Sequence, residues 1–161
     1  LKIVAILPQV LAIGECGLDT LAEISLPLQK EIFVSQIQLS KSLQKPMVIH
    51  CVRAFDEVLS LLKKQQPVAA VFHGFNKSEV VAKKIIEAGF YLSFGKALHT
   101  ERTANLFRAL PADRIFLETD NEPVGIQTIY QTAAEIRNTT MDKLLSQIVL
   151  NYLQLFKSDP Q

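Results

Sequence analysis

Short runs of β-branched and other apolar residues alternate along the chain with stretches in which apolar residues recur at helical spacing. The apolar runs predict five buried strands: Val10–Glu15, Met47–Cys51, Ala69–Gly74, Phe90–Gly95 and Ile115–Asp120. The stretches with helical spacing predict five helices: Leu28–Leu43, Phe55–Lys64, Ser78–Ala88, Gln127–Arg137 and Met141–Phe156. This alternation is typical of an α/β fold, a parallel sheet covered by helices on both faces.

Length and composition favour one globular domain over residues 1–161. The chain has 161 residues, of which 48% are apolar and 20% charged, enough for a single core and unlike a disordered segment. The formal charge of +1 excludes a broad polybasic surface, so a nucleic-acid partner would be held locally. No apolar run reaches the ~20 residues that cross a bilayer, and we expect no membrane partner.

The only two cysteines, Cys16 and Cys51, lie inside apolar runs. Such residues are typical of reduced, buried thiols, and they favour a cytoplasmic location. Cys51 is next to His50, but neighbours on a strand point to opposite faces. A Cys51–His50 nucleophile pair is therefore excluded.

Imidazole and carboxylate side chains stand at the expected C-terminal ends of four strands: Glu15, His50, His73 and Asp120. That edge of a parallel sheet is where ligands bind in α/β folds, so we expect these groups to converge. A lone histidine on a strand is more often a core residue than a ligand. Two histidines at matching strand ends, with acids ending two other strands, favour a divalent-cation site, because the cation offsets the repulsion between the acids.

Several other polar residues admit two interpretations. Arg53 follows His50 closely and is either a substrate-phosphate ligand, for which its planar guanidinium is suited, or a solvated residue at a helix start. Glu118 is either close to the metal site or a packing residue, and His99 is expected to face solvent. Gly14 and Gly17 are expected to permit a tight turn at a strand end.

Four ordered motifs carry a family resemblance. They are Ala12–Asp19 (AIGECGLD), Pro46–Cys51 (PMVIHC), Phe72–Phe75 (FHGF) and Leu117–Asp120 (LETD). With these motifs the chain resembles the TatD family of metal-dependent deoxyribonucleases, which are amidohydrolase-like TIM barrels. The resemblance covers nearly the whole chain and implies a (β/α)8-type barrel, of which this sequence supplies about five strands.

The resemblance also implies roles for individual residues. Glu15 resembles the carboxylate that bridges two divalent ions (Mg, Mn or Zn), and His50 and His73 resemble imidazole ligands. Asp120 resembles the acid that binds metal and orients or deprotonates the attacking water, which makes Glu15 and Asp120 the catalytic pair. The substrate implied is DNA, cleaved at a phosphodiester bond.

The chain departs from the family pattern in two places. It lacks the His-x-His pair of the first barrel strand, and residues Leu1–Pro8 resemble the end of the helix before the fourth barrel strand, so we expect the missing strands to precede Leu1. Asp120 also runs directly into Asn121, where family members have a longer loop, which we interpret as a missing segment. Two alternatives stay open: a hydrolase of small esters, lactones or amides on the same fold, or a non-catalytic scaffold.

Overall fold

The computed structural model describes residues 2–156 and contains one five-stranded sheet, as the sequence predicts for an α/β fold. The strands follow one another in chain order, and β1–β2, β2–β3 and β4–β5 pair in parallel. The strands are β1 Ile13–Asp19, β2 Met47–Val52, β3 Ala70–Phe72, β4 Tyr91–Phe94 and β5 Ile115–Leu117. Leu1, which the family resemblance includes, lies outside the described residues.

All five predicted helices are confirmed to within two residues at either end. The α-helices are α1 Lys2–Ala5, α2 Leu26–Leu43, α3 Phe55–Gln65, α4 Glu79–Glu87, α5 Glu101–Ala109, α6 Ile126–Ile136 and α7 Met141–Phe156. Two short 3-10 helices are η1 Lys96–His99 and η2 Ala112–Arg114. The sequence analysis did not predict α5, because few apolar residues mark its buried face; Thr100 caps its start by accepting a hydrogen bond from the Thr103 N–H.

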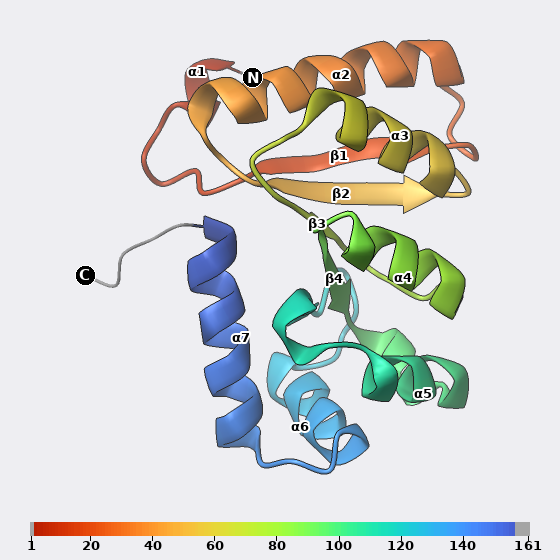
Figure 1. Cartoon of the computed structure of the whole chain (residues 1–161), viewed down its shortest axis with the longest axis vertical. Coiled ribbons are helices and arrows are strands. Elements are labelled where there is room, and N and C mark those ends of the chain that lie inside the picture. Colours follow the sequence, from red (N-terminus) through yellow and green to blue (C-terminus); the bar gives the residue numbers. More distant parts are fainter. Residues whose placement is uncertain (1, 157–161) are drawn as a thin grey trace. The chain divides into compact units, whose positions relative to one another are not determined.

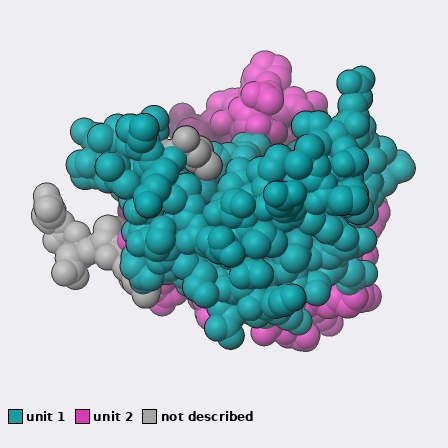
Figure 2. Space-filling model, turned by 90° about the horizontal axis from the view of Figure 1, so that it is seen from above, with its two compact units in different colours: residues 1–72, 88–90 teal, residues 73–87, 91–161 magenta. Residues whose placement is uncertain are grey.

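The chain divides into two compact units, shown in different colours in Figure 2. Among the described residues, unit 1 holds residues 2–72 and 88–90, and unit 2 holds residues 73–87 and 91–156. In unit 1, α2 packs on β1 and α3 packs on β2 (Figure 1). Phe33 and Ile37 of α2 are fully buried, as are Met47 and Ile49 of β2, and they form part of the core that holds these elements together.

The first strand differs from its prediction. It runs from Ile13 to Asp19, so Glu15 is its third residue and does not end it, contrary to the sequence analysis. Gly14 and Gly17 are strand residues that let β2 approach closely, not turn residues. A Cβ at Gly17 would lie 1.9 Å from the carbonyl oxygen of His50, and one at Gly14 would lie 2.7 Å from the Cβ of Val48. Glycines of this kind interrupt the apolar pattern by which strands are recognised.

The core of unit 2 is built around Phe94 of β4. The rings of Phe75 and Phe107 meet it edge-on, with centroids 5.7 and 5.2 Å away. The last strand, β5, ends at Leu117, so Asp120 follows it by three residues. Asp120 and Asn121 lie in a turn in which the Glu122 N–H donates to the Thr119 carbonyl at 3.2 Å.

No helix among residues 2–156 combines the length and the apolar character needed to cross a bilayer.

One buried amide fixes the start of β5 against α7. Asn151 is fully buried, and its amide nitrogen donates to the carbonyl oxygens of Ala112 and Ile115, each at 2.8 Å. Replacing Asn151→Leu roughly keeps the volume but removes the donor to the carbonyls of Ala112 and Ile115. We expect the free energy of unfolding to fall by about 2–4 kcal/mol in a urea titration. Leu150→Ala, at a half-exposed site on the same helix, should change it by less than about 0.5 kcal/mol; equal stability of the two variants would contradict this role.

Candidate metal centre

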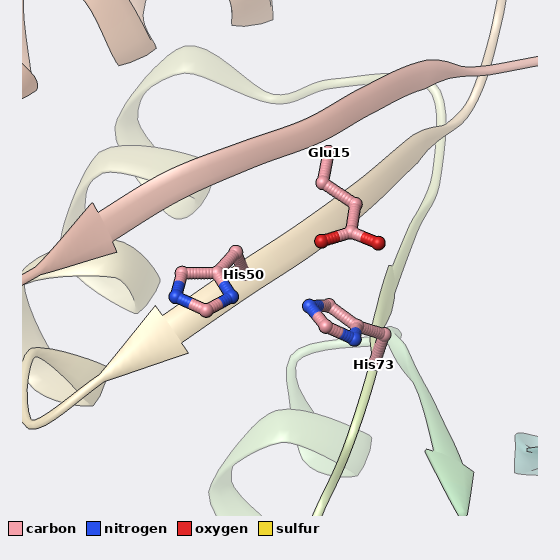
Figure 3. A group of neighbouring side chains, drawn as sticks. All are labelled: Glu15, His50 and His73. Carbon is pink, nitrogen blue, oxygen red and sulfur yellow. The ribbon is translucent and has the colours of Figure 1, made fainter. Parts of the chain in front are cut away.

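Three of the four side chains predicted to hold a metal come together in the structure. Glu15 extends from β1, His50 from β2 and His73 from the residue directly after β3 (Figure 3). One ligand atom of each lies within 4.8 Å of the others. These three residues are called the Glu15–His50–His73 group below.

The pairing of β2 with β3 accounts for the two histidines. Ile49 pairs with Phe72, and the next residue on each chain segment is a histidine. Residues at matching positions of neighbouring parallel strands point to the same face of a sheet. Both imidazoles therefore face the same side, as Figure 3 shows.

An irregularity in β1 positions Glu15. Ile13 pairs with Met47 and Cys16 pairs with Ile49, so three steps along β1 match two along β2. The extra residue is a bulge, which breaks the alternation of the strand. Ile13, Cys16 and Leu18 all stay buried, while both Gly14 and Glu15 are exposed.

The imidazole of His50 has a carboxylate partner on β1. Its Nε2 lies 3.4 Å from Oδ2 of Asp19, and the two side chains are 40% and 30% exposed. The pKa of Asp19 is lowered, first by the Leu21 N–H that donates to its carboxylate and further by His50. Because Nε2 faces Asp19, Nδ1 is the His50 atom that can serve a cation in the group.

His73 has a comparable partner. Its Nδ1 lies 3.7 Å from Oε1 of Glu118, which also accepts a hydrogen bond of 2.6 Å from the Gly74 N–H. Burial by itself would raise the pKa of Glu118, but the neighbouring imidazole of His73 and the donors of Ser93 and Gly74 outweigh burial and lower the pKa below its ordinary value. Glu118 therefore stays ionised. It lies beside His73 of the candidate site and is not simply a packing residue.

The donor set fits a divalent cation. A carboxylate and two imidazoles are ordinary ligands of zinc and similar metals. Metal-binding histidines almost always donate their second ring nitrogen to a carboxylate, carbonyl or water, which fixes the ring and its tautomer. Both imidazoles have such a carboxylate: Asp19 for His50 and Glu118 for His73. The sequence analysis missed Asp19, although it ends the same AIGECGLD motif as Glu15.

Two further predicted site residues lie outside this group. Asp120 is exposed and lines a cavity of about 490 Å³ in unit 2, together with Glu118, Lys96 and Glu122. This cavity is called the larger cavity of unit 2 below. Arg53 is exposed directly after β2, with a left-handed backbone (φ 53°). Their roles stay predictions.

The cysteine next to Glu15 is not a nucleophile. The Cys16 thiol is buried and lies within 3.7–3.8 Å of the carbonyl oxygens of Val48 and Ile13. Burial, followed by the charge of Glu15, raises the pKa of Cys16 to about 12, so the thiol is protonated at neutral pH.

Comparison with known protein families gives one consistent result. The family described as "TatD related DNase" matches residues 1–157. Among its relatives, the chain is 31% identical to the metal-dependent hydrolase YabD of Bacillus subtilis over 168 residues, 92% of this chain and 66% of that protein. It is 32% identical to the 3'-5' ssDNA/RNA exonuclease TatD of Erwinia tasmaniensis over 173 residues, 92% of this chain and 67% of the relative.

Solved structures agree on the fold. The TatD homologue YjjV of Escherichia coli K12 superposes with a TM-score of 0.86 at 24% identity, over 94% of this chain and 66% of that one. A TatD-family hydrolase of Entamoeba histolytica gives 0.81 at 19% identity, over 91% and 63%. The chain spans about two thirds of the length of the relatives it matches. The family match over almost all of the sequence and the identity to these relatives show that this chain belongs to the TatD-related DNase family.

Proposed function

We propose that this chain carries the metal-binding part of a hydrolase that cleaves phosphodiester bonds in DNA with divalent metal ions. The observation that carries the proposal is the Glu15–His50–His73 group, three metal-ligating side chains with a carboxylate behind each imidazole. The name of the Erwinia relative, an ssDNA/RNA exonuclease, supports a nucleic acid as substrate.

Glu15, His50, His73 and Asp120 would hold the divalent ions (Mg, Mn or Zn), two in number in this proposal. Bound divalent metals lower the pKa of a coordinated water and stabilise the charge that develops on a phosphate. Other residues of the chain position the metal ligands. Asp19 and Glu118 hold the imidazoles in one orientation and one tautomer, and this positioning is their contribution.

Asp120 has a second proposed role, toward the attacking water, and Arg53 is proposed to bind the substrate. Asp120 is the proposed base that accepts a proton from the attacking water, since its carboxylate is exposed and lines the larger cavity of unit 2. Arg53 is proposed to donate to a phosphate oxygen, because its guanidinium is exposed beside the end of β2.

The charge of the larger cavity supports metal dependence. Its lining holds the carboxylates of Glu118, Asp120 and Glu122, and its one lysine, Lys96, is paired with Glu122 at 2.8 Å. A phosphate diester would be repelled from such a cavity unless a cation were bound. Among residues 2–156, Cys16 and Cys51 form no disulfide, and we propose a cytoplasmic location for the protein.

Cleavage of a labelled single-stranded DNA tests the function directly. The full chain should shorten the oligonucleotide when Mn²⁺ is present and leave it intact with excess chelator. If the chain hydrolyses small esters or lactones in a metal-dependent reaction but leaves the DNA uncut, the result would contradict the proposal and favour the small-substrate alternative. Metal binding without turnover of either would identify a non-catalytic scaffold.

Removing one carboxylate charge tests the metal site itself. Glu15→Gln should weaken Mn²⁺ binding in calorimetry by more than about 100-fold, because a direct ligand is lost and outer partners already contribute about 10–100-fold. The melting temperature of the metal-free protein should stay unchanged, since Glu15 is exposed. Glu23→Gln, an exposed acid of the same unit, is the matched control; equal metal affinity of the two variants would show that Glu15 is no ligand.

The role of Asp19 in orienting His50 is tested separately. Asp19→Asn keeps the oxygen that accepts from the Leu21 N–H but removes the charge beside His50. Mn²⁺ affinity should fall by about 10-fold or more, with smaller effect than Glu15→Gln. In NMR spectra, the tautomer of the His50 ring should become mixed, whereas an unchanged ring signal together with unchanged affinity would rule out this role.

A further inference from the structure

Unit 2 has a second cavity, beside the start of α4 and helix α5. Its volume is about 380 Å³, and its lining includes Lys77, Glu79, Arg102 and Asn105. None of these residues belongs to the Glu15–His50–His73 group or lines the larger cavity with Asp120. This second cavity is called the α4–α5 cavity below.

The α4–α5 cavity carries uncompensated positive charge. Among residues 2–156, neither Lys77 nor Arg102 takes part in an ion pair or a side-chain hydrogen bond. The one acid in the lining, Glu79, is already paired with Lys83 at 2.7 Å. The side-chain oxygen of Asn105 accepts from Arg108 at 2.7 Å, which leaves the NH₂ group of Asn105 as the part that can donate to a ligand.

The two cavities of unit 2 are lined by adjacent residues of the same chain segments. Asn76 lines the larger cavity and the next residue, Lys77, lines the α4–α5 cavity. Thr100, the cap of α5, lines the larger cavity, and Arg102, in the first turn of α5, lines the α4–α5 cavity. Consecutive Cα atoms lie about 3.8 Å apart, so the cavities are neighbours.

The neighbouring cavities have opposite charge. The larger one is lined by the acids Glu118, Asp120 and Glu122, whereas the α4–α5 cavity presents Lys77 and Arg102. A substrate with a single phosphate beside Asp120 makes no use of the second cavity. A strand with one phosphate beside Asp120 would bring the next phosphates to Lys77 and Arg102.

We infer that Lys77 and Arg102 hold the phosphates of a nucleic-acid strand next to the one that is cleaved. Arg102 can bind phosphate oxygens with two N–H groups, and Lys77 acts as a point charge. The inference rests on the proposed function and refines it, because it makes the substrate a strand and not a small diester or ester. It also explains how a chain of nearly neutral charge holds a polyanion through a local contact.

The test is the binding of a fluorescent single-stranded oligonucleotide, as DNA and as RNA, to the full chain in excess chelator, where no cleavage occurs. The double variant Lys77→Ala, Arg102→Ala should bind roughly tenfold more weakly at about 50 mM salt. The slope of log Kd against log salt should fall by about 1.4, the value for two phosphate contacts on a single strand. With Mn²⁺, the variant should keep its kcat/KM for bis(p-nitrophenyl) phosphate and show a raised KM for the oligonucleotide.

The matched control is the double variant Lys64→Ala, Lys143→Ala, which removes two exposed lysines outside both cavities. Its net charge equals that of the Lys77→Ala, Arg102→Ala variant. It should bind like the unmodified chain. The inference is overturned if the unmodified chain binds no oligonucleotide or if the two double variants bind it equally well. It is also overturned if anionic lipid vesicles displace the oligonucleotide when both are present at the same concentration of phosphate groups. A chain that binds with the expected salt slope but cleaves neither substrate would contradict the proposed function and not this inference.

Discussion

The register between β2 and β3 is the constraint on which the candidate site depends. Pairing of Ile49 with Phe72 gives each strand a histidine at the next position, and both imidazoles then face one side. A slip of one residue would turn His50 to the other face. The buried Met47, Ile49 and Phe72 resist that slip, because it would expose their side chains to water. The core thus fixes the position of the polar site, while the polar side chains contribute little to folding.

The third member of the group depends on a different feature, the close approach of β1 and β2. Glycine at positions 14 and 17 removes the Cβ atoms that would collide with Val48 and with the carbonyl of His50. The bulge between Ile13 and Cys16 then exposes Glu15 without exposing its apolar neighbours. The AIGECGLD motif therefore combines three tasks in one strand: close packing, a ligand in Glu15, and a partner for His50 in Asp19.

The sequence predicted most of this arrangement where the pattern was apolar and regular. Strand β2 and the histidines on β2 and after β3 follow from continuous apolar runs, and helix α7 has its predicted bounds. Strand β1 was misplaced because glycines and acids make it look like a turn. Helix α5 was missed because its buried face includes Thr103 in place of an apolar residue. Contacts such as Asp19–His50 and His73–Glu118 join residues 31 and 45 positions apart, and nothing local in the sequence indicates them.

The distribution of charge links the site to its surroundings. Acids gather around the imidazoles and in the larger cavity of unit 2, so a bound cation would lower the electrostatic cost of the site as well as provide its chemistry. Crystals soaked in Mn²⁺ and measured for anomalous scattering test this account most directly. It predicts a peak within coordination distance of Nδ1 of His50, Nε2 of His73 and the carboxylate of Glu15. A map with no peak among these three side chains, or with the only peaks at surface acids, would contradict it.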